Sequence, residues 1–186
     1  MKLLAAIAFA MAPAIAAGQL DPKTLQAPPE SRWFNLDRSS TGYVAGGKLG
    51  GTLWAFHVRG QEMKRLQPTT FSIDGAILQV RAVPRESVKD AQGGVLAAHK
   101  RAEQAYQSKG TAGLTFVEHD FCRGSSVAHE QWVARAPSGM AQAFVTFEVG
   151  DYVLMVMSPY ENAQRREATA RSLGEVCSTL QLNKLS

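Results

Sequence analysis

The clearest pattern of hydrophobic and polar positions lies near the carboxyl end of the chain. Residues 141–149 alternate, and one face of this segment is formed by Ala143, Val145, Phe147 and Val149. This period of two is typical of a β-strand with one buried face. Gly150 and Asp151 form a two-residue turn signal, and residues 152–158 are apolar at nearly every position. The pattern predicts a β-hairpin whose second strand is central in the sheet and covered on both faces.

Two segments carry apolar residues at the three-to-four-residue spacing of amphipathic helices. Residues 161–180 place such a stripe toward the sheet, formed by Ala163, Ala170, Leu173, Cys177 and Leu180. The other segment covers residues 87–107, in which Gly93 and Gly94 weaken the first half by on the order of 1 kcal/mol each relative to alanine. Either this helix starts later than Ser87, or close packing at the glycines requires small residues.

Further strands are predicted where apolar or alternating runs end at turn residues. They cover residues 33–36, 52–59, 71–73, 76–83, 114–123 and 127–136. Asp74 and Gly75 join two of them in a favoured type I′ hairpin turn. Strands followed by a helix, four consecutive strands and a final helix predict a single α+β domain, in which the final helix covers an antiparallel sheet.

A glycine-rich segment, residues 42–51, nearly matches the phosphate-binding loop G-x-x-x-x-G-K-[ST]. The match fails at Leu49, where a hydroxyl group would contact magnesium, and no helix pattern begins at Lys48. The sequence therefore gives little support for nucleotide binding. We expect these glycines to form a flexible hairpin tip or a bulged edge strand that contacts a partner.

The first residues have the features of an export signal. Lys2 supplies a positive charge, residues 3–11 are apolar, and an A-x-A cleavage site ends at Ala16. The apolar run is too short to span a bilayer. These features predict a cleaved signal peptide over residues 1–17 and a periplasmic location for the mature protein.

Residues 18–30 contain three prolines and predict an extended segment, after which residues 31–186 form the domain. The formal net charge of +4 falls to +3 once Lys2 is removed. This excess is small and unclustered, so no nucleic-acid partner is expected. No further apolar run reaches the length of a membrane span, so no integral membrane segment is expected.

Cys122 and Cys177 are the two cysteines of the chain. An exported protein folds in an oxidising compartment, so one disulfide between them is expected. In the chain-entropy model, closing a loop of this size stabilises the fold by roughly 4 kcal/mol. Two buried free thiols are the alternative.

The densest group of side chains with metal-binding or acid–base chemistry is Glu118-His119-Asp120, with Cys122 and His129. On a strand, Glu118 and Asp120 share one face and His119 points to the other, so the group does not converge on a metal. The strand rise places the Cα atoms of Glu118 and Asp120 about 6–7 Å apart, a spacing compatible with a hydrolase pair. No serine lies in a G-x-S-x-G nucleophile elbow. We expect no enzyme activity, metal or cofactor; a hydrolase or metal-dependent enzyme using Glu118 and Asp120 is the alternative.

The carboxyl end of the chain resembles a known family of domains. A strand such as Tyr152-Val-Leu-Met-Val-Met-Ser158, a polar helix and the ending Cys177-Ser-Thr-Leu-Gln-Leu182 are similar to the end of Mog1/PsbP-like domains. The resemblance implies an α/β sandwich, in which one antiparallel sheet is flanked by helices. It also implies a family whose members mostly bind other proteins, and it transfers no catalytic residue to this chain.

These observations predict a non-enzymatic protein-binding module of the bacterial envelope, such as an accessory factor or an immunity protein that blocks a toxin. Its partner would be another envelope or secreted protein. Trp and Tyr side chains often anchor interfaces, and the expected binding residues are Tyr43, Lys48, Trp54 and Trp132. Carriage of a small ligand between sheet and helices is a second alternative.

Overall fold

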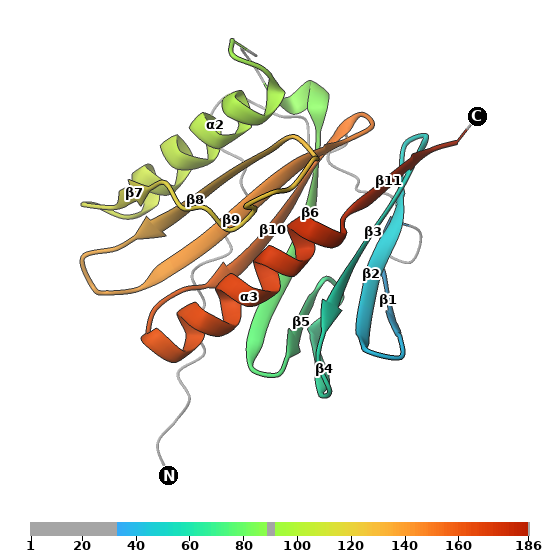
Figure 1. The fold of residues 1–186 in the computed structure, drawn as a ribbon. Helices are drawn as coiled ribbons and strands as arrows, with labels where there is room; N and C mark the ends of the chain where they lie inside the picture. Colours follow the sequence, from blue (N-terminus) through green and yellow to red (C-terminus); the bar gives the residue numbers. More distant parts are fainter. Residues whose placement is uncertain (1–32, 89–91, 186) are drawn as a thin grey trace.

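The computed structural model describes residues 33–88 and 92–185 (Figure 1). The predicted signal peptide, residues 1–17, and the predicted extended segment, residues 18–30, lie outside this part of the chain. The described elements are β1 (Asn35–Arg38), β2 (Gly42–Leu49), β3 (Thr52–Arg59), β4 (Met63–Gln67), β5 (Thr70–Ile73), β6 (Ala76–Pro84), the 3-10 turn η1 (Arg85–Ser87), α2 (Val95–Gly110), β7 (Thr115–Val117), β8 (His129–Arg135), β9 (Ala141–Val149), β10 (Tyr152–Pro159), α3 (Ala163–Thr179) and β11 (Gln181–Lys184).

The strands confirm the α+β class, but they form two antiparallel sheets where the sequence predicted one. The large sheet has seven strands in the order β4-β5-β6-β10-β9-β8-β7, and the small sheet has four in the order β1-β2-β3-β11. The chain after α3 returns to β3, with Leu182 opposite Trp54, and so completes the small sheet. At four residues, β11 is too short to show a clear alternation in the sequence.

The predicted hairpin near the carboxyl end is confirmed as β9 and β10. Tyr152 pairs with Val149 across the turn, where Gly150 has the positive φ of 58° that glycine accepts readily. β10 lies at the centre of the large sheet, and residues 153–158 are all buried. A strand covered on both faces reads as a continuous apolar run, which explains why this position was visible in the sequence.

Two layers of elements cover the large sheet, one on each face (Figure 1). On one face, α2 packs through Val95 and Leu96 against Val153 of β10. On the other face, α3 and the small sheet share a large core with the large sheet, to which Trp54, Val145, Leu154, Leu173 and Val176 belong. None of the described helices is long and apolar enough to cross a membrane.

The first predicted helix starts later than Ser87, which was one of the two explanations considered for its glycines. Gly93 and Gly94 have φ angles of 78° and 95°, and the helix begins directly after them at Val95. These angles lie in the left-handed region, which a helix cannot include. The second predicted helix is confirmed as α3, and Asn162 caps it by accepting a hydrogen bond of 2.9 Å from the backbone N–H of Arg165.

The strand predicted over residues 114–123 is wrong beyond Val117, where β7 ends. The following residues form a loop instead. The backbone N–H groups of Phe121 and Cys122 donate to Oε1 of Gln131, at 2.7 and 3.1 Å. A side chain thus takes the hydrogen bonds that a neighbouring strand would otherwise supply.

The sequence predicted a flexible hairpin tip or a bulged edge strand at the glycine-rich segment, and this prediction is wrong. Most of the segment is the regular strand β2, paired with β1 on one side and β3 on the other. Only Gly50 and Gly51 form the turn. A Cβ on Gly47 would collide with the backbone carbonyl of Trp33, and one on Gly42 would collide with that of Val58. These glycines permit close backbone packing, which explains their number.

A disulfide joins Cys122, in the loop after β7, to Cys177 on α3. The two Cα atoms are 5.1 Å apart, within the usual range for a disulfide. Both residues are buried in the core between α3 and the large sheet. The pairing therefore matches the one expected from the sequence, and it is compatible with folding in an oxidising compartment.

Candidate functional site

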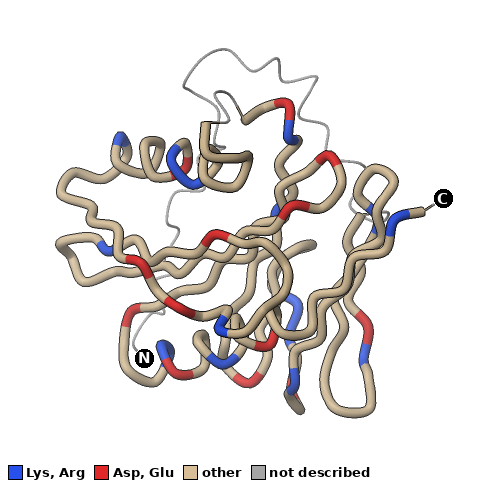
Figure 2. The backbone as a smooth tube through the Cα atoms, turned by 45° about the horizontal axis from the view of Figure 1, so that its top comes forward, with Lys and Arg blue, Asp and Glu red and all other residues tan. Residues whose placement is uncertain are grey.

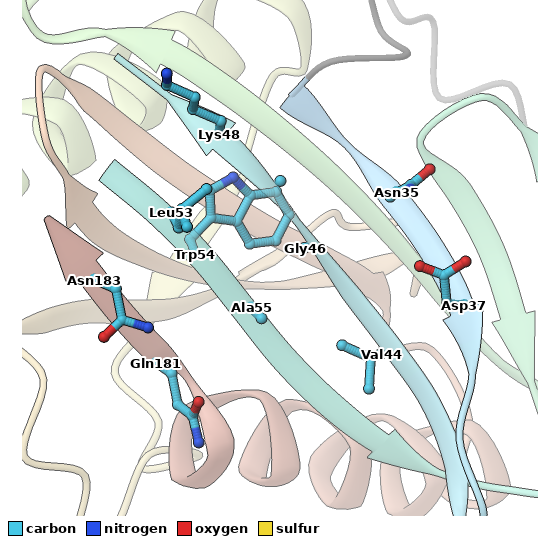
Figure 3. Close-up of a pocket in the computed structure, with 11 residues that line it drawn as sticks. Asn35, Asp37, Val44, Gly46, Lys48, Leu53, Trp54, Ala55, Gln181 and Asn183 are labelled. Carbon is cyan, nitrogen blue, oxygen red and sulfur yellow. The ribbon is translucent and has the colours of Figure 1, made fainter. Parts of the chain in front are cut away.

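The outer face of the small sheet, which points away from the large sheet, carries a depression of about 450 Å³ (Figure 3). Its floor is formed by Gly46 of β2 and Ala55 of β3, which are opposite each other in register. In the same row, Asn35 of β1 flanks Gly46 and Gln181 of β11 flanks Ala55. The depression is therefore a trough, with two small residues between longer side chains on both edge strands.

The alternation of side chains along the strands explains why this face is exposed and carries few large side chains. On β3, Trp54, Phe56 and Val58 point into the core, so Leu53 and Ala55 between them point outward. β2 follows the same rule, with Val44, Gly46 and Lys48 on the outer face. The inner face thus carries large aromatic side chains, while the outer face has few bulky ones.

Polar groups border this trough. Asn35, Gln181 and Asn183 offer side-chain amides, which both donate and accept hydrogen bonds. Lys48 lies at one end and Asp37 lies toward the other (Figure 3). Along the described backbone as a whole, acidic and basic residues are interspersed (Figure 2). The trough therefore combines hydrogen-bonding edges with one positive and one negative charge.

Of the four binding residues predicted from the sequence, Lys48 and Trp54 line the trough, and only Lys48 is exposed there. Tyr43, Trp54 and Trp132 are 5%, 2% and 0% exposed and belong to the core, which corrects their assignment as surface anchors. The hydroxyl of Tyr43 donates to the carbonyl of Gln61 at 3.1 Å. Trp132 stacks on Phe144 beneath α2, with ring centroids 4.9 Å apart. Large aromatic rings fill cores as readily as interfaces, so residue type alone cannot distinguish the two.

The acidic pair of the alternative enzyme hypothesis lies in a loop, where each carboxylate has its own cationic partner. Glu118 accepts from Nζ of Lys100 at 2.7 Å, and Asp120 lies 3.1 Å from Nε of Arg123. His119 between them bonds through Nε2 to the hydroxyl of Tyr160 at 2.9 Å. Within the described ranges, no group of three or more His, Cys, Asp or Glu side chains is placed to hold a metal ion.

The residues of the trough that sequence reasoning missed are Asn35, Asp37, Ala55, Gln181 and Asn183. Two of the three strands that carry them, β1 and β11, have only four residues each. The usable signal was the position of Ala55 between Trp54 and Phe56, which marks an outward-facing small residue.

In comparisons with known proteins, no family model matches the chain, and no curated protein matches it significantly.

Proposed function

We propose that this chain is an exported, non-enzymatic protein-binding module of the bacterial envelope, and that the outer face of the small sheet is its binding surface. The observation that carries the proposal is the trough itself: Gly46 and Ala55 leave space between amide side chains, with Lys48 and Asp37 toward its ends. Such a face accepts the side chains and the backbone of another protein. An accessory factor of the envelope, or an immunity protein that blocks a toxin, would use a surface of this kind.

Two further features support this assignment. Periplasmic export fits the A-x-A site before residue 17 and the buried disulfide. A Mog1/PsbP-like sandwich fits an antiparallel sheet with a helix on each face, although the additional small sheet goes beyond the family pattern that the sequence suggested. We include both in the proposal.

The trough supports protein binding better than carriage of a small ligand. Its volume of about 450 Å³ is within the range of small-ligand sites, but those sites are clefts or cavities that enclose most of the ligand. Here the floor is the outer face of a sheet, and the sides are amides on edge strands. A partner with a broad surface can cover such a face, whereas a small molecule would remain largely in water.

The decisive experiment fills the trough without touching the core. Ala55→Arg adds a long side chain on the outer face, and Ala128→Arg makes the same change at an exposed loop position before β8. Immobilised wild-type protein and both variants are exposed to an envelope extract, and the retained protein is then purified and titrated. We expect wild type and Ala128→Arg to bind it equally and Ala55→Arg to bind it at least about tenfold more weakly. Equal binding by all three would refute the proposed surface.

The enzyme alternative has its own test. Cell-wall, ester and phosphate substrates are offered to the purified protein, and any turnover is compared with that of Glu118→Gln and Asp120→Asn. Loss of turnover in correctly folded variants would favour the hydrolase. Since each carboxylate is paired with a separate cation, we expect no turnover that depends on them.

A further inference from the structure

Two opposite charges on the outer face of the small sheet are separated along the strand direction (Figure 3). Asp37 is opposite Val44, and Lys48 lies four residues beyond Val44 on β2. At about 3.3 Å per residue, the separation along the strand is roughly 13 Å. Among the ion pairs of the described residues, none includes either side chain. Both charges are therefore available to a partner.

The surface between these charges has room for a side chain from outside. Gly46 lies midway between Val44 and Lys48, and a Cβ there would come within 2.8 Å of the Trp54 carbonyl oxygen. Close packing of β2 on β3 thus requires glycine at this position. Leu53, which is 40% exposed, adds apolar surface beside the space.

We propose that the partner presents an extended strand in which a basic residue, an apolar residue two positions away and an acidic residue four positions away all face this sheet. This inference rests on the binding function proposed above. Alternate side chains of a strand point to one side, so such residues share a face and span about 13 Å. The basic side chain meets Asp37, the apolar one enters the space above Gly46, and the acidic one meets Lys48.

The amide side chains on the edge strands complete this arrangement. Asn35 on β1 and Gln181 on β11 flank the row that contains Gly46 and Ala55. Three interstrand spacings, about 14 Å, separate β1 from β11, which leaves room for one extended backbone between them. Each amide offers a donor and an acceptor to that backbone. The amides then supply general affinity, while the two charges determine which sequence is preferred.

The test uses β-hairpin peptides, because a hairpin holds the strand extended before binding. One outward strand reads Lys-Thr-Val-Thr-Glu; the second reads Lys-Thr-Val-Thr-Lys; the third, Lys-Thr-Val-Glu-Thr, turns the acidic side chain to the opposite face. Their dissociation constants are measured at low salt by NMR titration. Wild type is expected to bind the first hairpin at least about tenfold more tightly than either of the others.

A charge reversal in the protein checks the assigned contact. Lys48→Glu is expected to reverse the preference in favour of the second hairpin, and Lys64→Glu, the same change on the exposed strand β4, is expected to leave the wild-type preference intact. The inference is overturned if wild type does not distinguish the hairpins, if it binds none at millimolar concentration, or if Lys48→Glu keeps the wild-type order.

The experiments distinguish failure of this charge-spacing inference from failure of the proposed binding function. If the hairpins are not distinguished while Ala55→Arg still abolishes capture of the envelope protein, binding at the trough stands and the charge spacing is wrong. If Ala55→Arg has no effect on capture, the binding surface itself is wrong.

Discussion

The carboxylate of Glu175 on α3 holds Arg59 at the end of β3. Its Oε1 atom lies 2.7 Å from Nε of Arg59, and its Oε2 atom accepts a hydrogen bond of 2.8 Å from the backbone N–H of the same residue. Glu175 is buried, whereas the side chain of Arg59 is mostly exposed. Because Glu175 is buried, its contact with the Arg59 backbone fixes α3 against the small sheet.

Glu175→Ala is expected to lower the free energy of unfolding by about 1–3 kcal/mol, because it removes the charged acceptor of the Arg59 backbone N–H. Glu167→Ala, at an exposed position of the same helix, is the matched control and is expected to stay within about 0.5 kcal/mol of wild type. Urea denaturation followed by circular dichroism measures both. Equal losses in the two variants would contradict this role for Glu175.

Reduction of the disulfide between Cys122 and Cys177 is expected to destabilise the protein by roughly 4 kcal/mol in the chain-entropy model, because the two cysteines are 55 positions apart in the sequence. Thermal unfolding with and without reductant shows the effect as a lower melting temperature. Alkylation and mass measurement without reductant give the control. Two alkylated cysteines in the native exported protein would show that the bridge does not form.

Elements with strong local signals could be predicted from the sequence. The hairpin of β9 and β10 follows from alternation, a glycine turn and an unbroken apolar run. The hairpin of β5 and β6 follows from Asp74 and Gly75, whose positive φ angles of 45° and 86° match the expected turn. Both depend on neighbouring residues alone, so no long-range information was needed.

Features that depend on distant parts of the chain could not be predicted. The small sheet gains its fourth strand because Leu182 pairs with Trp54, and nothing in either segment specifies the other. β7 ends early because the side chain of Gln131 binds the backbone at Phe121 and Cys122. Such competition between a side chain and a neighbouring strand leaves no periodic trace in the sequence.

The candidate site was predicted only in part, for a related reason. Lys48 was singled out and does lie on the trough, because a lysine beside glycines is rarely buried. Tyr43 and Trp54 were chosen by residue type, and the alternation of their strands turns both inward. Asn35 and Gln181 are ordinary polar residues until the pairing of β1 and β11 places them in one row.

Export predicts a defined amino terminus. The mature protein is expected to begin at Ala17 or Gly18, because signal peptidase cuts after the A-x-A site that ends at Ala16. Mass spectrometry of the protein from the envelope fraction measures this directly, and the unprocessed chain from cytoplasmic extract serves as the reference. A protein that retains Met1 and stays in the cytoplasm would contradict the periplasmic assignment.

Stability is expected to depend on pH through His99, a buried residue of α2. Burial, with a smaller effect of the Arg81 guanidinium, lowers the pKa of His99 from 6.5 to about 4. Between these values the unfolded chain binds a proton that the folded protein does not, so the stability contributed by neutral His99 is lost as the pH falls from about 6.5 toward 4. A shift of this size corresponds to on the order of 3 kcal/mol.

His99→Gln removes the titrating group and is expected to flatten the fall in unfolding free energy between pH 6.5 and 4, measured by urea denaturation at each pH. Glu103, one turn further along α2, is the control with the opposite sign. Burial raises the pKa of its carboxyl, so its contribution is present at low pH and is lost as the pH rises through that raised value. Glu103→Gln should therefore steepen the acid loss that His99→Gln flattens. If His99→Gln keeps the wild-type pH dependence, the buried imidazole is not its source.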